Sequence, residues 1–375
     1  MDNLSASAPG VDQRDAPDGR TAARATSRSP DASAFPAVQG TGRAAATLVI
    51  LALLLLGTVL VAAGIGPYRI PPLDVLAAVF RRAIGSAAAG PVETVLFNIR
   101  LPRVLAAVLV GAALSAAGAA YQSLFRNPLV SPDILGVSTG AGLGAVVGIL
   151  LGLPVAAIQL LGFGGGLATV ALVAMLARTL RGGGDVLVLV LAGIVVGALA
   201  GAAISLVKVL ADPYDQLPAI TFWLLGSLAG VKPGDVGGVL PVVVFGLAPL
   251  ILLRWRIGVL SLGDDEARAL GIDVSRLRVL VIAAATLITA SVVAISGVIG
   301  WVGLMVPHMV RLLVGPRFDR LLPASILLGA AFMVAVDTLA RSGAKIEIPL
   351  GVLTAVIGGP AFVWLLARRR HRELP

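Results

Sequence analysis

Residues 101–124 read LPRVLAAVLVGAALSAAGAAYQSL, and this stretch decides the fold. From Val104 to Leu124 it contains no charged residue. A helix of this length rises about 31 Å, enough to cross the roughly 30 Å of hydrocarbon in a bilayer. The stretch also lacks the alternation of polar and apolar residues that a barrel strand requires. The sequence therefore predicts a membrane-spanning α-helix over 104–124.

Similar apolar stretches recur on both sides of this helix. We therefore predict an all-α, polytopic membrane protein with about ten transmembrane helices, because only hydrogen-bonded helices or closed barrels are stable in lipid. The predicted spans are 44–63, 104–124, 134–152, 155–177, 186–207, 235–253, 279–299, 302–313, 322–340 and 349–367. The stretch 302–313 is too short to cross alone, and the apolar segment 217–229 is predicted to lie at an interface.

The composition agrees with a lipid-embedded chain. The 375 residues are 58% hydrophobic and 13% charged, whereas soluble domains are about 25% charged. Cysteine is absent and the only histidines are His308 and His371, so the sequence offers no disulfide, thiolate or His/Cys metal site. None of the three lysines follows a glycine-rich phosphate loop, so any ATP hydrolysis is expected on a partner.

Polarity divides the chain into three parts. Residues 1–43 are rich in Ala, Ser, Pro and Asp, which predicts a disordered cytoplasmic tail; 44–370 form a transmembrane domain and 371–375 a cytoplasmic C-terminus. With the N-terminus inside and alternating spans, 20 of the 29 Lys and Arg residues fall on the inner side. The positive-inside rule then predicts a plasma-membrane protein with both termini in the cytoplasm. The net charge of +9 reflects this topology and not nucleic-acid binding.

Two patterns bear on helix packing. Glycine recurs at every fourth position on two predicted spans, which indicates faces where helices approach closely. These glycines are Gly144, Gly148 and Gly152 on one span, and Gly193, Gly197 and Gly201 on the other. The segments 103–124 and 278–299 both open with Arg-Val-Leu and are expected to cross in opposite directions, which indicates an inverted repeat.

The longest polar stretch inside the membrane domain is SLGDDEARALGIDVSRLR at 261–278, within the cytoplasmic segment 257–278. Its acidic run favours the first turn of a short helix, with Ser261 or Asp264 as the cap and Gly271 at the C-terminus. We predict two short helices divided at Gly271. The stretch is interpreted either as a docking surface for a soluble partner or as a solvated amphipathic loop.

Three arginines lie on the predicted outer side. Arg100 and Arg103 flank Leu101-Pro102 at the start of one span, and Arg341 ends another. Charge is unfavourable in the bilayer centre, so we expect these side chains at the surface, where they bind carboxylates or anchor at the interface. Asp337, one helical turn before Arg341, is expected to pair with it.

Five ordered blocks resemble the FecCD-type permease family, and the likeness extends from about residue 44 to 370. The blocks are LPRVLAAVLVGAALSAAGAAYQSLFRNPLVSPDILGVSTGAG (101–142), EARALG (266–271), SGVIGWVGLMVPHMVR (296–311), DTLAR (337–341) and IPLGVLTAVIGGPAFVWLL (348–366). This family supplies the membrane subunits of ATP-binding-cassette (ABC) importers for ferric siderophores, haem and cobalamin.

The resemblance implies a ten-helix subunit that pairs with itself or with a related permease. It also implies two cytoplasmic ATPase subunits, which bind ATP and Mg, and an extracytoplasmic substrate-binding protein. By motif position, it assigns ATPase coupling to Asp265, Glu266, Ala267, Leu270 and Gly271. It assigns binding-protein docking to Arg100, Arg103 and Arg341, and a cytoplasmic gate to Asn127, Pro128 and Leu129.

We therefore predict the permease subunit of an importer for a ferric siderophore, with cobalamin or haem as the alternative cargo. The chain itself is predicted to hydrolyse nothing and to bind no metal, cofactor or nucleic acid. An ion-coupled secondary transporter is the rival from another class; it would need coupling carboxylates near the midplane, where Asp337 is the only candidate. An intramembrane enzyme would need a nucleophile and base that the sequence does not offer.

Overall fold

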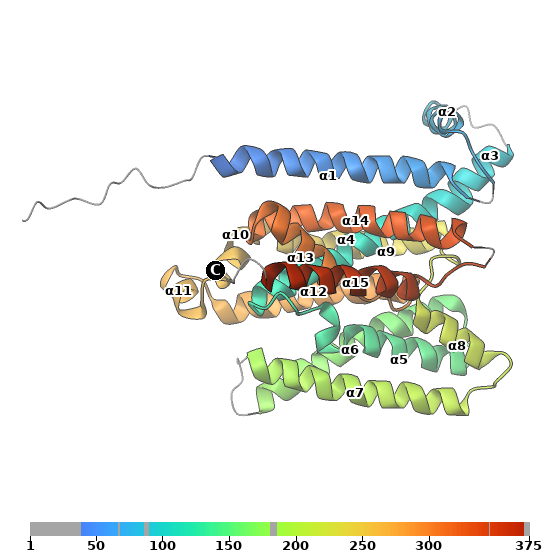
Figure 1. Ribbon diagram of the computed structural model, residues 1–375. Coiled ribbons are helices and arrows are strands. Elements are labelled where there is room, and N and C mark those ends of the chain that lie inside the picture. The colour runs from blue at the N-terminus through green and yellow to red at the C-terminus, as the bar shows by residue number, and fades with distance from the viewer. Residues whose placement is uncertain (1–38, 67, 86–89, 181–185, 345, 371–375) are drawn as a thin grey trace, which may run out of the picture. The chain divides into compact units, whose positions relative to one another are not determined.

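The chain folds into a bundle of long helices, shown in Figure 1 as a computed structural model. The structure describes residues 39–66, 68–85, 90–180, 186–344 and 346–370, and no strand occurs among them. Residues 1–38 of the predicted tail and the predicted C-terminal segment 371–375 lie outside this range. The first helix begins at Gln39, before the predicted start of the membrane domain at residue 44.

Each predicted span has a corresponding helix. These helices are α1 (Gln39–Gly64), α4 (Leu101–Leu124), α5 (Val137–Leu150), α6 (Val155–Thr179), α7 (Val186–Leu210), α9 (Pro233–Leu252), α12 (Val274–Ser296), α13 (Val302–Val314), α14 (Phe318–Ser342) and α15 (Leu350–Arg370). Among the described residues, seven helices are long and apolar enough to cross a membrane. They confirm a polytopic all-α protein, while the count of about ten includes shorter helices.

Two of the shorter helices are α5 and α13. The predicted span 134–152 contains only the 14 residues of α5, which rise about 21 Å. Gly136, at φ +77°, separates α5 from the short 3₁₀ helix η2 (Pro132–Leu135). The 13 residues of α13 match the prediction that this stretch is too short to cross alone.

Shorter elements connect the long helices. They are α2 (Pro72–Ala83), α3 (Pro91–Thr94), the π-helical segment η1 (Val95–Arg100), α8 (Gln216–Leu225), α10 (Arg254–Leu260) and α11 (Asp264–Ala269). Helix α2 was not predicted. The predicted span of α4 begins at residue 104, whereas α3, η1 and α4 form a continuous helical run over 91–124. Helix α8 corresponds to the predicted interfacial segment 217–229.

The bundle has two distinct ends. In Figure 1, α10 and α11 lie at one end, here called the α11 end, and α2, α3 and α8 lie at the other, here called the α2 end. The end of α4 and the start of α12 meet at the α11 end, because Arg126 and Arg278 both contact Asp264. Helices α4 and α12 therefore pack side by side and antiparallel, as an inverted repeat requires, and the repeat itself remains a prediction.

Helix α4 forms the core of the bundle. Nearly all of its residues are buried, against α14, α12, α13 and α9. Small residues permit this packing: a Cβ built on Gly111 would lie 2.1 Å from the carbonyl oxygen of Gly329. Among the glycines singled out from the sequence, Gly144 and Gly193 make similarly close backbone contacts, whereas Gly201 faces open space. Close approach is therefore confirmed for part of each predicted face.

Candidate functional site

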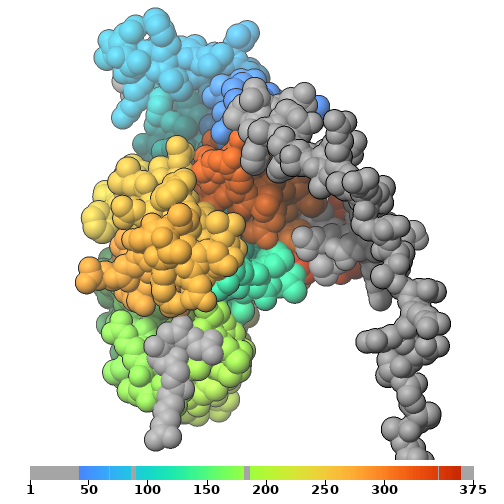
Figure 2. All heavy atoms as spheres, turned by 90° about the vertical axis from the view of Figure 1, so that its left-hand side faces the viewer, coloured from blue at the N-terminus to red at the C-terminus, as the bar shows by residue number. Residues whose placement is uncertain are grey.

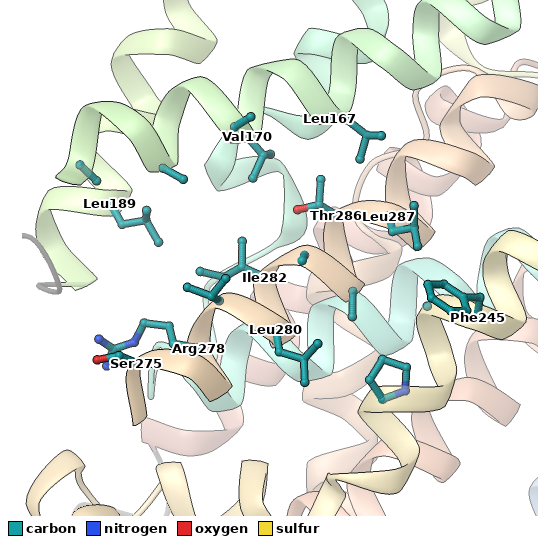
Figure 3. Close-up of a pocket in the computed structure, with 18 of the residues that line it drawn as sticks. Leu167, Val170, Leu189, Phe245, Ser275, Arg278, Leu280, Ile282, Thr286 and Leu287 are labelled. Carbon is teal, nitrogen blue, oxygen red and sulfur yellow. The ribbon is translucent and has the colours of Figure 1, made fainter. Parts of the chain in front are cut away.

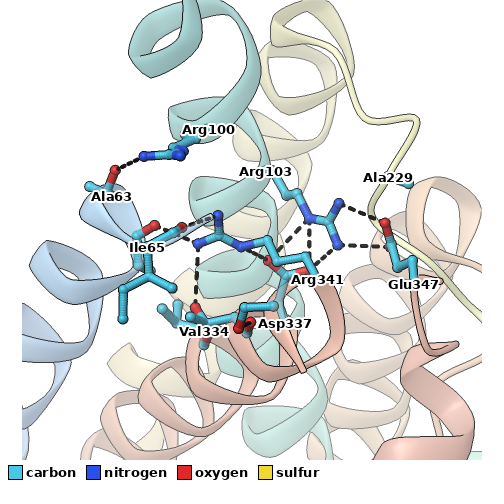
Figure 4. A network of polar contacts seen from close by, with 12 residues as sticks. Ala63, Ile65, Arg100, Arg103, Ala229, Val334, Asp337, Arg341 and Glu347 are labelled. Atoms are coloured by element: carbon cyan, nitrogen blue, oxygen red, sulfur yellow. Dashed lines mark hydrogen bonds and ion pairs between the residues drawn. The ribbon is translucent and has the colours of Figure 1, made fainter. Parts of the chain in front are cut away.

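A network of charged side chains joins α4, α14 and the segment before α15 at the α2 end (Figure 4). Arg103 donates from Nε to Asp337 Oδ1 at 2.9 Å, and from its terminal nitrogens to the Glu347 carboxylate at 2.8 and 3.1 Å. Arg341 lies one turn after Asp337, with its Nε 3.6 Å from Asp337 Oδ2. With Arg100 included, the network contains three guanidinium groups and two carboxylates. It therefore carries one excess positive charge.

The other two arginines hold the end of α1. The last carbonyl groups of an α-helix have no donor within the helix. Arg100 donates to the carbonyl oxygens of Ala63 at 2.8 Å and Gly64 at 3.1 Å. Arg341 donates to the carbonyl oxygen of Ile65 at 2.6 Å. Because a helix C-terminus favours cations, these contacts fasten α1 to α14 and to η1, which continues into α4.

The burial of these arginines corrects the prediction that their side chains lie on the surface. Arg100 is only 4% exposed, and the side chains of Arg103 and Arg341 are 12% and 8% exposed. Burial is tolerated because carbonyl and carboxylate oxygens replace the lost water. Asp337 does pair with Arg341, as predicted, but its closer partner is Arg103, at 2.8 Å.

Glu347 is the member of the network that the sequence analysis missed. It lies just before α15 and also accepts a hydrogen bond from Ser227 Oγ at 3.2 Å. Its side chain is 24% exposed, compared with 1% for that of Asp337. Glu347 is the only acidic residue between Asp337 and Glu373 in the sequence. A lone acidic residue between two apolar helices was the one sequence feature that could have indicated a partner for the arginines.

At the α11 end, the acidic run forms a helix that ends as predicted. Gly271 has φ +76°, and its N–H donates to the Arg268 carbonyl at 2.9 Å. The next N–H, of Ile272, donates to the Ala267 carbonyl at 3.0 Å. These two bonds form a Schellman motif, in which glycine accommodates the left-handed backbone.

The start of α11 differs from the prediction. Its N-cap is Gly263, with no side-chain cap, so the expected capping by Ser261 or Asp264 was wrong. Glu266 folds back over Gly263, where a Cβ would lie 1.8 Å from the glutamate Oε2. The second predicted short helix is the first turn of α12, which Asp273 caps by accepting the Arg276 N–H at 3.0 Å. The loop therefore continues directly into a membrane helix.

Asp264 joins this loop to two core helices. Its Oδ1 accepts from Arg126, just after α4, at 3.0 Å. Its Oδ2 accepts from Arg278, in the first turns of α12, at 2.9 Å. The Asp264 side chain is 27% exposed and the Arg278 side chain 13%. A displacement of α11 would therefore act on both α4 and α12.

The outer face of α11 is accessible. Asp265, Glu266 and Leu270 are exposed, whereas Ala267 is fully buried and anchors the helix. Beside them lies a hollow of about 400 Å³, lined by the turn between α11 and α12 and by the start of α10. Figure 2, which looks onto the α11 end, shows the orange residues around α11 on that face of the molecule. These side chains are therefore accessible to another protein, and a docking role for them remains a prediction.

The predicted gate turn lies beside α11. Asn127 Oδ1 accepts the Leu129 N–H at 2.9 Å, which forms an Asx-type turn. Arg126, the residue before it, has φ +49° and binds Asp264. Pro128 is half-buried and Leu129 is 51% exposed. The structure thus brings the turn and α11 together, and a gating role for the turn remains a prediction.

No group of three acidic or histidine side chains that could hold a metal ion occurs among the residues that the structure describes. His308 is buried at the centre of α13, with its ring centroid 5.8 Å from that of Phe362. The functional chemistry visible here consists of charged contacts at the two ends of the bundle.

The chain is similar in sequence to known membrane transport proteins. The pattern of the FecCD transport family matches residues 51–368. The molybdate import system permease protein MolB of Haemophilus influenzae is 38% identical, over 83% of this chain and 92% of its own length. The cobalamin import system permease protein BtuC of Halobacterium salinarum is 42% identical, over 75% of this chain and 76% of its own.

A solved structure is also similar. It is an inward-facing ABC transporter assigned to the metal-chelate type, with a TM-score of 0.78 and 37% sequence identity. The match covers 86% of this chain and 99% of the other. The family match and the structural similarity therefore both extend over most of the helical bundle.

Proposed function

Because the chain belongs to the FecCD transport family, the membrane subunits of ABC importers, we propose that it carries a ferric siderophore across the cytoplasmic membrane. Partner ATPases hydrolyse the ATP, and this chain is a transport subunit and not an enzyme. Family membership also decides between an ATPase-driven importer and an ion-coupled carrier in favour of the importer.

The cargo proposal is carried by the similarity to a metal-chelate transporter over 86% of the chain. A chelate wraps its metal in its own ligands, so the permease does not need to supply any. Hard or borderline metal ions would otherwise require carboxylate or imidazole clusters in the path. Cobalamin and haem are the alternative cargoes within the same family. Because one relative is named for molybdate import, an oxyanion is a further alternative.

We place the ATPase contact on the exposed face of α11, around Asp265, Glu266, Leu270 and Gly271. When ATP closes the two ATPase subunits, movement of this face displaces Asp264 and, through it, Arg126 and Arg278. The ends of α4 and α12 shift together, and the Asn127–Pro128–Leu129 turn follows because Arg126 precedes it. This is a conversion of partner closure into rearrangement of packed helices.

At the α2 end, we propose that acidic residues of the binding protein dock on Arg103 and Arg341, with Arg100 behind them. Because all three arginines are largely buried, an incoming carboxylate has to compete with Glu347, the more exposed acid of the network. The excess positive charge favours this exchange, and electrostatic attraction would speed the encounter.

This assignment of the ends puts α11 and both termini in the cytoplasm and the arginine network outside. The excess of Lys and Arg on the α11 side supports that orientation. In the assembly, the chain pairs with a second copy or with a related permease, and the path for the cargo runs between the two subunits.

Uptake by proteoliposomes tests the cargo. The permease would be reconstituted with its ATPase and binding protein, and ATP-dependent uptake measured for a ⁵⁵Fe-siderophore, cyanocobalamin, haemin and molybdate. We expect the iron chelate to accumulate and the other three to remain outside. Uptake of one of the others in its place would reassign the cargo without changing the importer mechanism.

A further inference from the structure

A large cavity opens between α6 and α7 on one side and α9 and α12 on the other (Figure 3). Its volume is about 880 Å³, near the upper end of the roughly 300–1,000 Å³ of small-molecule sites. Its lining contains one serine, one threonine and two arginines. The other lining residues are apolar, with Leu167, Val170 and Phe245 among them.

The charged residues of the cavity lie at one end only, and the Thr286 hydroxyl farther along is hydrogen-bonded to the Tyr121 hydroxyl at 3.1 Å. Ser275 and Arg278, at the start of α12, lie together at this charged end in Figure 3, while Phe245 and Leu287 lie at the far end. Arg178, in the last turn of α6, also lines the cavity. Both charged residues of the lining are therefore cations, and both belong to helix ends on the α11 side.

The length of the cavity matches one leaflet of a bilayer. Lining residues on α6 extend from Leu167 to Arg178, which is about 16 Å along a helix. On α12 they extend from Ser275 to Leu287, about 18 Å. Half of the hydrocarbon core is about 15 Å thick. An acyl chain would fill the apolar part and leave its headgroup level with the arginines.

We propose that this cavity is a binding site for an anionic phospholipid, with an acyl chain between α6 and α12 and the phosphate at Arg178. Basic pockets between transmembrane helices on the cytoplasmic side recognise such headgroups. Arg278 is already bound to Asp264 at 2.9 Å, so the exposed Arg178 supplies most of the attraction. The first-turn hydroxyl of Ser275 adds a donor. The bound lipid would brace α12 beside the residue that links it to α11.

Charge and shape favour this occupant over the cargo. A metal chelate exposes polar groups that a mostly aliphatic wall would leave without hydrogen bonds. The inference depends on the chain spanning a membrane and is independent of which substrate it transports.

Native mass spectrometry of the full chain, in the assembly in which it purifies, tests the site. The protein would be released from nanodiscs containing phosphatidylglycerol and phosphatidylcholine with identical acyl chains, in about equal amounts. We expect phosphatidylglycerol to be retained preferentially. Arg178→Gln should reduce that preference about fivefold, since one basic residue near the surface is lost. Lys208→Gln, at the other end of α7 and outside the cavity, should not change it.

A second pair of variants tests the apolar part. Ala283 is exposed and lines the cavity, so Ala283→Trp should displace a retained lipid of either class. Val244→Trp, exposed on α9 but outside the lining, should retain it. Equal retention of both lipids by the unmodified protein, or an unchanged preference in Arg178→Gln, would overturn the proposal. So would an Ala283→Trp variant that keeps its lipid but loses a second copy of the chain, because the cavity would then be a subunit interface.

Discussion

Arg103 and Glu347, which are 244 residues apart in the chain, form a two-pronged contact of 2.8 and 3.1 Å at the α2 end of the bundle. The same guanidinium binds the buried Asp337 at 2.9 Å. Glu347 is thus the internal partner of an arginine that we propose as a docking residue. Removing its charge would leave the position open to a carboxylate from another protein.

Glu347→Gln should tighten capture of an acidic binding protein. The variant raises the excess positive charge of the network and weakens the internal competitor, so the dissociation constant should fall several-fold at low salt and less at high salt. Asp74→Asn removes the charge of an exposed carboxylate on α2, at the same end of the bundle. It should change the dissociation constant less. Binding measured by interferometry on nanodiscs would show both, and weaker capture by Glu347→Gln would argue against the exchange.

Arg100→Met should loosen α1. The variant removes the donor to the Ala63 carbonyl and one of two donors to the Gly64 carbonyl, which also accepts the Ile70 N–H at 3.1 Å. Loss of a hydrogen bond from a charged group costs about 1.5–3 kcal/mol. Thermal unfolding in detergent should occur at a lower temperature, and hydrogen exchange should increase in the last turn of α1. Arg82→Met, an exposed arginine stacked on Phe97, is the matched control. An equal decrease of the unfolding temperature in both variants would show that Arg100 does not cap α1.

Gly111→Ala should destabilise the bundle. The new methyl group would lie 2.1 Å from a backbone oxygen of α14, so α4 and α14 have to separate, and overpacking of this kind costs about 1–3 kcal/mol. Gly201→Ala, where a Cβ meets no atom within 4 Å, should be neutral or slightly stabilising. Thermal unfolding of the two variants would separate close packing from helix propensity.

Asp264→Asn should uncouple ATP hydrolysis from transport. It weakens the contacts to Arg126 and Arg278 while leaving the exposed face of α11 unchanged, so the ATPase should still bind but uptake per ATP should decrease. Asp319→Asn, at the start of α14, where the carboxylate makes a local pair with Arg317 at 3.0 Å, should leave uptake per ATP unchanged. Normal uptake per ATP in Asp264→Asn would show that the link to α4 and α12 is dispensable.

The membrane architecture could be predicted from the sequence because lipid imposes a simple rule on apolar helices. Hydropathy located α1, α4, α6, α7, α9, α12 and α14, but it did not reveal that Gly136 shortens α5. It also missed α2, which has only 12 residues, three of them charged, and is therefore too short and too polar to register as a span.

The state of the arginine network could not be predicted. Arg103 is 234 residues from Asp337 and 244 from Glu347, and no local pattern reports such partners. Arg100 was predicted to lie at the surface because charged side chains favour water. In the structure, backbone carbonyl groups of α1 take the place of that water. The end of α11 at Gly271, by contrast, depends on local sequence and was predicted.

The most direct test of the account is ATP-driven uptake in proteoliposomes that contain this permease, with and without its ATPase. We predict uptake only when the ATPase and ATP are both present, and none with the Glu266→Arg variant, which should insert normally but fail to hold the ATPase on α11. Sustained accumulation by the permease alone, driven by an ion gradient, would contradict the proposal that α11 receives its motion from a partner.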